Sequence, residues 1–345
     1  MARVPVILDT DIGDDIDDAW ALAYLLAEPA CDLRLVVTAY GDRGRHLLRA
    51  AVVRRFLAAA GRTDVPVALG TASWGRSGSS RPDCGQRRWA EAAPPGDAAP
   101  APEEDGVGAM VAAIRASAEP VTLLCLAPLC NVAAMLDRAG DDVASRVRLV
   151  SMQGSVRKGY DGSPRTSAEH NVACDPAACA RALAAPWLCK PLLAPLDTCG
   201  LFWLREPQLR RLAGPAAAPL VGALLEANRA WMQDSRVARR HYRELDAAKS
   251  STVLFDVLAA FLALHPDGGG LVEVRSLQLK VADDGRTVEG EVGPHVQCAM
   301  DWLGGGPQEL GARVVDALLG AQENAGAPPR GKKRPAAAAC GEPKL

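Results

Sequence analysis

The sequence predicts an α/β fold: a single Rossmann-like domain with an open, mostly parallel sheet flanked by helices, and a small β-hairpin near the C-terminus. Two observations favour this class. Short apolar runs that suit buried strands alternate with segments whose apolar residues recur at helical spacing, which is typical of a parallel sheet with helices on its faces. With 345 residues, 49% of them hydrophobic, the chain can also bury a large core.

The N-terminal part of the chain supplies the beginning of this sheet. The predicted order is strand 4–8, helix 19–27, strand 33–39, helix 46–62 and strand 66–69. Residues 70–106 are rich in Gly, Ser, Pro and Arg, and their apolar residues show no period. We expect a long loop there, which is either a functional lid or a tolerated insertion.

The same alternation continues from residue 121. The predicted order is strand 121–126, helix 132–137, strand 147–152, a helix starting at Asp175-Pro176, strand 188–196, helix 206–235 with a break near residues 214–215, and helix 252–264. Residues 272–281 and 288–296 alternate apolar and polar positions, so they predict two strands joined by the turn 283–285. A helix at 308–321 completes the fold.

The composition changes near the C-terminus. Residues 1–322 form the predicted α/β domain, whereas residues 323–345 consist mainly of Ala, Gly, Pro and Lys. Such a segment cannot bury enough apolar surface to fold, so we expect a disordered tail. The basic residues at 332–334 are weak evidence for a targeting patch.

Charge and cysteine usage narrow the partners and the compartment. The formal net charge is -2, which gives no reason to expect nucleic acid or an anionic membrane as a partner. No apolar run reaches the length of a membrane span, and the N-terminus shows no secretory signal pattern. The ten cysteines are scattered without a CxxC pair, as in a reducing compartment. We therefore expect a cytoplasmic protein.

The chemistry of the chain is concentrated in an acidic turn, residues 9–18, which holds six carboxylates between the first strand and the first helix. Like charges this close raise one another's pKa unless a cation or hydrogen-bond donors compensate for them. A hard cation with oxygen ligands is the simplest compensation. The alternative is a heavily charged helix start, because acidic residues cap free N–H groups and complement the helix dipole.

Six motifs in order make the chain resemble the inosine/uridine-preferring nucleoside hydrolase family over residues 4–321. They are DTDIG followed by DDA within residues 9–19, AGRTDVPV at 60–67, PLCN at 128–131, AEHN at 168–171 with Asp175-Pro176, PLD at 195–197 and FD at 255–256. The acidic turn is two residues longer than the DTDxGxDDA pattern of the family. That insertion leaves the register of the carboxylates open, and Asp9, Asp14 and Asp15 could cap, hydrogen-bond or compete for the same roles.

The resemblance implies a Ca²⁺ ion at the bottom of a ribose pocket. The implied side-chain ligands are Asp11, Asp18 and Asp256, with Asp15 as a possible addition, and Cys130 would contribute its carbonyl oxygen. Calcium accepts many flexible oxygen ligands, so it can hold carboxylates, sugar hydroxyls and a water together.

The resemblance also implies which residues carry out each part of the reaction. Asp11 would act as the general base for the attacking water, and the residues implied to bind the ribose hydroxyls are Asp17, Asp42, Glu169 and Asn171. The expected activity is calcium-dependent hydrolysis of the N-glycosidic bond of ribonucleosides. A pocket lined by carboxylates favours the positive charge that develops on the sugar. The implied partner is a small nucleoside, and the implied assembly is a homodimer or homotetramer.

The residues expected near the leaving nucleobase depart from the family pattern. Members that cleave purines or have broad specificity usually carry a His before the late Asp, where it can protonate the leaving base. Here that residue is Phe255, which cannot act as an acid. His241 and Tyr242 lie upstream in a segment that could border the pocket. Asp42 stands where the family has Asn.

Two other functions remain open at this stage. A non-catalytic nucleoside- or ribose-binding protein of the same fold would explain Phe255 and Asp42. A haloacid-dehalogenase-like phosphatase also has Asp-x-Asp after its first strand, but it requires Thr or Ser where this chain has Gly13.

Overall fold

The computed structural model describes residues 3–73, 84–92, 100–214 and 218–324. Within these residues, nine strands form one sheet in the order β3-β2-β1-β4-β5-β6-β9-β7-β8. The strands are β1 (Val4–Thr10), β2 (Cys31–Thr38), β3 (Val67–Leu69), β4 (Val121–Cys125), β5 (Val147–Ser151), β6 (Leu192–Leu193), β7 (Val272–Val281), β8 (Thr287–Glu289) and β9 (His295–Trp302). The predicted α/β class is confirmed.

The sheet is parallel from β3 to β9, and only its last two strands run the other way. β7 is antiparallel to β9, and β8 is antiparallel to β7. The predicted strand at 288–296 is therefore two strands, β8 and β9. β7 and β8, joined by the predicted turn 283–285, form the predicted small hairpin, and β9, which pairs with both β6 and β7, joins that hairpin to the main sheet.

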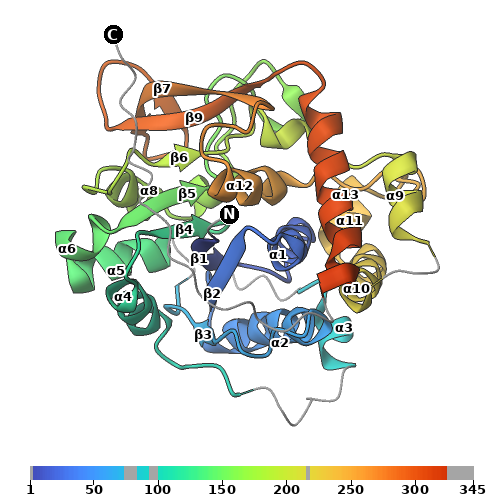
Figure 1. The fold of residues 1–345 in the computed structure, drawn as a ribbon. Coiled ribbons are helices and arrows are strands. Elements are labelled where there is room, and N and C mark those ends of the chain that lie inside the picture. Colours follow the sequence, from blue (N-terminus) through green and yellow to red (C-terminus); the bar gives the residue numbers. More distant parts are fainter. Residues whose placement is uncertain (1–2, 74–83, 93–99, 215–217, 325–345) are drawn as a thin grey trace.

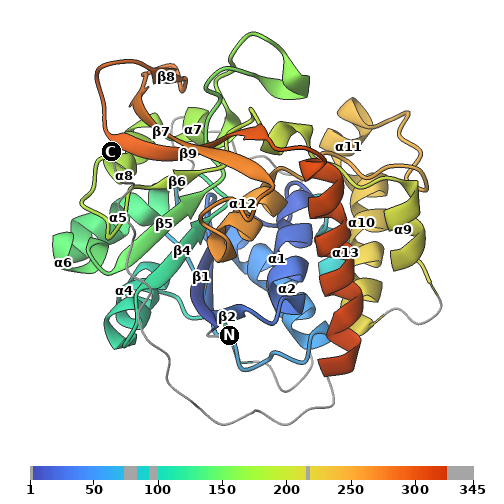
Figure 2. The same ribbon diagram turned by 45° about the horizontal axis from the view of Figure 1, so that its top comes forward.

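Helices cover both faces of the sheet (Figures 1 and 2). One face carries α4 (Gly106–Ala116), α5 (Cys130–Ala139), α6 (Asp141–Ala144) and α8 (Pro176–Leu183). The other carries α1 (Asp17–Ala27), α2 (Arg43–Ala59), α9 (Glu206–Leu212), α10 (Pro219–Asp234), α12 (Phe255–Leu264) and α13 (Gly306–Asn324). The shorter helices are α3 (Arg87–Glu91), α7 (His170–Cys174), α11 (Arg236–His241) and the 3-10 turns η1 (Tyr160–Gly162) and η2 (Cys199–Leu201).

Several boundaries differ from the predicted ones for physical reasons. The predicted strand 188–196 pairs only at Leu192–Leu193, because Pro191 and Pro195 lack the N–H that a ladder needs. The predicted helix 252–264 starts at Phe255. The predicted loop 70–106 contains the short helix α3, while residues 74–83 and 93–99 lie outside the described residues.

The predicted break in the helix 206–235 separates α9 from α10, with residues 215–217 outside the described part. At the C-terminus, α13 continues to Asn324, two residues past the expected domain end at 322. Residues 325–345, which make up most of the expected tail, lie outside the described residues.

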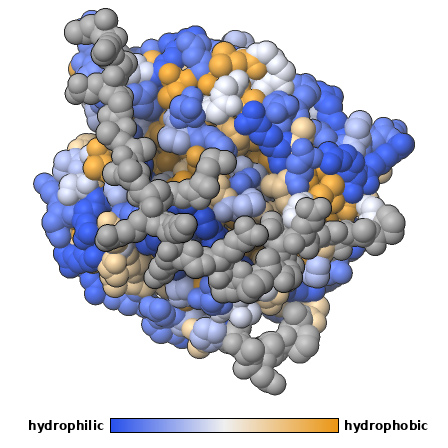
Figure 3. All heavy atoms as spheres, in the orientation of Figure 1, coloured by the Kyte–Doolittle hydropathy of each residue, from blue (hydrophilic) through white to orange (hydrophobic). Residues whose placement is uncertain are grey.

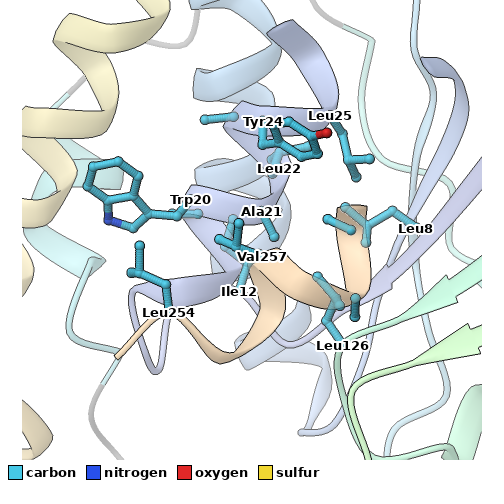
Figure 4. Packing of buried hydrophobic residues seen from close by; sticks show 14 of the residues in the cluster. Leu8, Ile12, Trp20, Ala21, Leu22, Tyr24, Leu25, Leu126, Leu254 and Val257 are labelled. Atoms are coloured by element: carbon cyan, nitrogen blue, oxygen red, sulfur yellow. The ribbon is translucent and has the colours of Figure 1, made fainter. Parts of the chain in front are cut away.

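The N-terminal helix α1 and the late helix α12 pack side by side in the larger core. Figure 4 shows Trp20 and Ala21 of α1 beside Leu254 and Val257, which lie at the start of α12. All four side chains are at most 1% exposed. This packing brings the acidic start of α12 next to the acidic start of α1, although the two helices lie near opposite ends of the domain sequence.

The surface and the cysteines have the character expected for a protein with such a core. Hydrophilic residues cover much of the described surface on the face seen in Figure 3, with smaller apolar areas between them. No described helix combines the length and the apolar character that crossing a membrane requires. Eight of the described cysteines are buried, as expected for small core residues.

Candidate active site

The predicted site residues meet at one edge of the sheet. Since β1, β2, β4 and β5 are parallel, their carboxyl ends lie together. β1 is flanked by β2 on one side and β4 on the other, so the order of connection reverses beside it. Ligands of open α/β sheets bind at such a reversal. The acidic turn leaves β1 at this point.

Three carboxylates form the centre of the site. Asp17 and Asp18 in the first turn of α1 and Asp256 in the first turn of α12 each offer an oxygen, and these oxygens lie within 4.8 Å of one another. The three side chains are between 3% and 5% exposed. Thr10 donates a hydrogen bond to Asp18. The cluster thus unites Asp18 and Asp256 as predicted, and it adds Asp17, which was expected on the ribose.

Burial disfavours ionisation of these groups. Desolvation raises the pKa of Asp17, Asp18 and Asp256 well above the ordinary value, and the charges of neighbouring carboxylates, Asp11 among them in each case, raise it further. The pKa of Asp11 rises to about 7, mainly through burial, while the charge of Arg49 acts in the opposite direction. A divalent cation would reverse the balance for all four groups. The donor set therefore fits a hard cation with oxygen ligands.

A buried arginine fixes the acidic turn. The Arg49 guanidinium on α2 is completely buried and donates to the backbone carbonyls of Asp11, Ile12 and Tyr40. It also pairs with the Asp14 carboxylate at 3.0 Å, and Arg45 binds the other Asp14 oxygen at 2.8 Å. Asp14 is thereby neutralised by two guanidinium groups and does not join the three-carboxylate cluster.

The backbone of the turn is tied down from other directions as well. The side chain of Gln86 donates to the Asp15 carbonyl at 2.9 Å, and the Trp231 indole donates to the Asp14 carbonyl at 2.9 Å. The Cys84 thiol lies 3.1 Å from the carbonyl oxygen of Gly13. The segment around α3, which was predicted as loop, is thus part of the scaffold of the acidic turn.

Asp9 has a hydrogen-bond partner that the sequence did not predict. Asn131, the last residue of the PLCN motif, donates to Asp9 Oδ1 at 2.7 Å and to the Thr38 carbonyl at 3.0 Å. Burial raises the Asp9 pKa to about 7, and Asp9 Oδ2 has no hydrogen-bond partner among the residues that the structure describes. Burial together with the Asp9 charge raises the pKa of the Cys130 thiol to about 12. Cys130, the proposed carbonyl ligand, thus lies near the first Asp of the turn.

The residues expected at the ribose occupy three neighbouring loops. The Glu169 carboxylate accepts hydrogen bonds from the backbone N–H groups of Gly154, Asn171 and Val172 at 2.8–3.2 Å. These bonds oppose the burial that raises its pKa. The Asn171 amide donates to carbonyls at the ends of β4 and β5. Asp42 caps α2 by accepting from the Arg45 N–H at 2.9 Å, and it is exposed.

The residues expected on the leaving-group side differ in their surroundings. Phe255, next to Asp256, has its ring 6.0 Å from that of Tyr160 in an edge-on contact. Tyr242 makes a backbone hydrogen bond with Val253, and the charges of Asp15 and Asp17 contribute to raising its pKa. His241 is exposed at the end of α11. Tyr242 therefore faces the acidic turn, whereas His241 lies on the surface. We refer to Tyr160, Tyr242 and Phe255 as the aromatic side.

Comparison with known families assigns this architecture. Residues 6–322 match the model of the inosine-uridine preferring nucleoside hydrolases. The chain belongs to this family. This membership excludes the phosphatase alternative. The acidic edge of the sheet contains residues from the motifs that suggested a nucleoside hydrolase.

Curated relatives of the nucleoside hydrolase family match part of the chain. The non-specific ribonucleoside hydrolase RihC of Klebsiella pneumoniae is 33% identical over 193 residues, which are 52% of this chain and 57% of that protein. The pyrimidine-specific ribonucleoside hydrolase RihA of Escherichia coli is 31% identical over 188 residues, or 51% of this chain and 55% of the relative. The chain thus spans little more than half the length of these relatives.

Solved nucleoside hydrolases share the fold over almost the whole chain. A plant nucleoside hydrolase has a TM-score of 0.74 at 18% identity and covers 92% of this chain and 99% of its own. A purine-preferring ribonucleoside hydrolase from Gardnerella vaginalis has a TM-score of 0.70 at 19% identity and covers 93% and 100%. At this identity the likeness establishes the fold.

Proposed function

We propose that this nucleoside hydrolase family member hydrolyses the N-glycosidic bond of ribonucleosides to ribose and free base, with Ca²⁺ as cofactor. The observation that carries the proposal is the convergence of Asp17, Asp18 and Asp256, three buried carboxylates from two helices with oxygens within 4.8 Å. Three such groups without a compensating cation would be costly to bury. Bound there, Ca²⁺ would hold the sugar hydroxyls and lower the pKa of a water.

The ligand set is part of the proposal. Asp18 and Asp256 are proposed as side-chain ligands, with Asp11 completing the set and the Cys130 carbonyl contributing from the start of α5. Asp17, which the cluster includes, is the natural candidate to bridge the cation site and the ribose. Asp15 remains a possible additional ligand, since its charge contributes to the raised pKa of Asp17.

Protein groups around the sugar would supply the remaining chemistry. Asp11 is proposed as the general base, because Arg49 holds its backbone and its charge contributes to the raised pKa of Asp18 in the cluster. A carboxylate beside the attacking water is a suitable group to accept its proton. Asp42, Glu169 and Asn171 are proposed to position the ribose hydroxyls. The surrounding negative charge would stabilise the oxocarbenium-like transition state.

The experiment is a ribose-release assay on purified protein with inosine, adenosine, uridine and cytidine, with added Ca²⁺ or with the chelator EGTA. We expect ribose release with Ca²⁺ and its loss with EGTA. Release that persists after exhaustive chelation would contradict calcium dependence. The absence of ribose from all four nucleosides, with binding detected by calorimetry, would support a nucleoside-binding protein instead.

That second function has one specific observation in its favour. By the family resemblance Phe255 stands where a His would protonate the leaving base, and its ring contacts Tyr160. His241 and Tyr242 are the replacements proposed from the sequence. Assembly as a homodimer or homotetramer is also proposed, and light scattering on the purified protein tests it.

A further inference from the structure

The chemistry of the proposed reaction requires a proton on the base side. When the bond between C1′ and the base nitrogen breaks, its electron pair stays on that nitrogen. An unprotonated purine or pyrimidine would leave as an anion, so a proton donor lowers the barrier. Phe255 has no proton to give. The following inference rests on the proposed function and asks which residue replaces it.

We propose that His170 is the general acid that protonates the leaving base. His170 is the first residue of α7 and stands between Glu169 and Asn171, two of the residues proposed to bind the ribose. It is partly buried, so its ring is within the structure yet reachable by a ligand. An imidazole is the side chain best suited to give a proton near neutral pH.

Contacts place His170 on the rim of the site. Its backbone N–H donates to the Tyr160 hydroxyl at 3.0 Å, and the Tyr160 ring meets Phe255 at 6.0 Å. The charges of Glu169 and Asp17 contribute to the raised pKa of that tyrosine. The His170 backbone is thus bonded to Tyr160, whose ring meets Phe255, the residue before Asp256 of the carboxylate cluster.

The ring itself is oriented by its neighbours. It meets Tyr40 in an edge-on contact, with ring centroids 6.4 Å apart, and the Cys174 thiol lies 3.6 Å from Nε2. Tyr40 has a positive φ of 55°, a conformation that costs energy for a residue with a side chain. Arg49 holds the Tyr40 carbonyl in place. The same arginine therefore fixes the proposed base, Asp11, and a residue that packs against the proposed acid.

The other histidines are less suitable. His46 is buried, both of its ring nitrogens are hydrogen-bonded, and burial lowers its pKa to about 4. His265 packs on Phe261 after the C-terminal end of α12, the opposite end from Asp256. His241 and His295 are exposed on α11 and β9. All five histidines of the chain are among the described residues.

Tyr242 is the main competitor, but its hydroxyl is a poor donor. Burial raises its pKa well above the ordinary value, so the phenol holds its proton tightly. In the proposed step the bond to the base breaks as the His170 imidazolium transfers its proton to the base. The water oxygen bonds to C1′, and the proton of that water passes to Asp11. The products are ribose and neutral base, and proton exchange with solvent restores both side chains.

Two leaving groups test this assignment. Inosine needs a proton on its base, whereas 4-nitrophenyl β-D-ribofuranoside releases a stable anion without one. The variant His170→Phe removes the proton but keeps a ring, and His295→Phe is the control on an exposed histidine. We expect His170→Phe to lower kcat on inosine by about 10²–10³-fold and on the nitrophenyl riboside by less than about threefold. The control should match the wild type on both.

The alternative outcomes are distinct. An equal loss on both substrates would make His170 a structural residue, and no loss on inosine would exclude it as the acid. His170→Gln, checked for folding by thermal unfolding, repeats the comparison if the Phe variant does not fold. Failure of the wild type on both substrates would contradict the proposed function itself. If the wild type cleaves only the nitrophenyl riboside, the assignment of His170 as general acid is wrong, although hydrolysis of a glycosidic bond is retained.

Discussion

The acidic turn and the aromatic side of the same site are held in different ways. Arg49, Asn131, Gln86 and Trp231 all reach the acidic turn, and each donates at least one hydrogen bond to it. On the aromatic side the rings of Tyr160 and Phe255 are in contact, the Tyr242 ring packs on Trp231, and the hydroxyls of Tyr160 and Tyr242 are bonded to backbone groups. The turn is a preorganised polar site, whereas the aromatic side is a packing surface.

The difference indicates how the two halves can vary. A charged constellation must be complete, because removing one partner leaves another charge buried and unpaired. A surface of rings tolerates substitution of similar volume. We therefore expect substitutions in the acidic turn to have large effects on activity and stability together, and substitutions on the aromatic side to have smaller effects, mainly on substrate preference.

The largest expected effect is from Asp256→Asn, which removes one carboxylate of the cluster without changing its size. We expect ribose release to fall by at least about 10³-fold, because cation binding and charge stabilisation are lost together. In EGTA the same variant should unfold at a higher temperature than the wild type, since one of the mutually repelling carboxylates is gone. A variant that keeps wild-type activity would remove Asp256 from the cation site.

The next effect is from Arg49→Met, which removes the buried guanidinium at similar length. The variant leaves the carbonyls of Asp11, Ile12 and Tyr40 without this donor, and Asp14 keeps only Arg45. We expect a loss of about 3–5 kcal/mol in the free energy of unfolding, measured in urea. Arg43→Met on the same helix removes an exposed pair with Glu104 and should leave stability unchanged. Equal effects of the two variants on the free energy of unfolding would contradict the role of Arg49 in holding the acidic turn.

A pH series in EGTA sharpens the comparison without mutation. The folded-state pKa values of Asp9 and Asp11 are raised to about 7, and those of Asp17, Asp18 and Asp256 are also raised. The folded state then binds more protons than the unfolded state between about pH 4 and 7, so the free energy of unfolding should fall as pH rises through that window. Saturating Ca²⁺ should flatten this dependence. A stability that rises with pH in EGTA would contradict the shared burial of these groups.

The smallest expected effect is from Tyr242→Phe on the aromatic side. The variant keeps the ring, which contacts Trp231, and loses the hydroxyl that bonds to the Val253 backbone. We expect a change in kcat/KM of about tenfold or less, and a loss of stability of about 0.5–1.5 kcal/mol. The measurement is a comparison of inosine and uridine. A loss as large as that of Asp256→Asn would place Tyr242 in the catalytic machinery and break the contrast between the two halves.

The sequence predicted the fold class and the order of most elements, because strand-like runs and helical periods are local signals. It placed Asp18 and Asp256 together through ordered motifs. It did not reveal the partner of Asp14, because Arg45 and Arg49 resemble an ordinary basic helix face. Nor did it reveal that Asn131 binds Asp9, since a hydrogen bond across 122 positions leaves no periodic signature. The predicted strand boundaries were wrong at β6, which two prolines shorten, and at β9, which lies beside β6 in the sheet.

The packing of α1 against α12 also has a consequence for biosynthesis. Asp17 and Asp18 leave the ribosome well before Asp256, which follows only after most of the sheet has been made. A cation bound by both helices closes a very long loop, so it stabilises only a chain whose later part has already folded back onto its beginning. Calcium affinity would thus serve as a late checkpoint of folding, and a nascent chain that ends before α12 should neither bind the ion nor be protected by it from proteolysis.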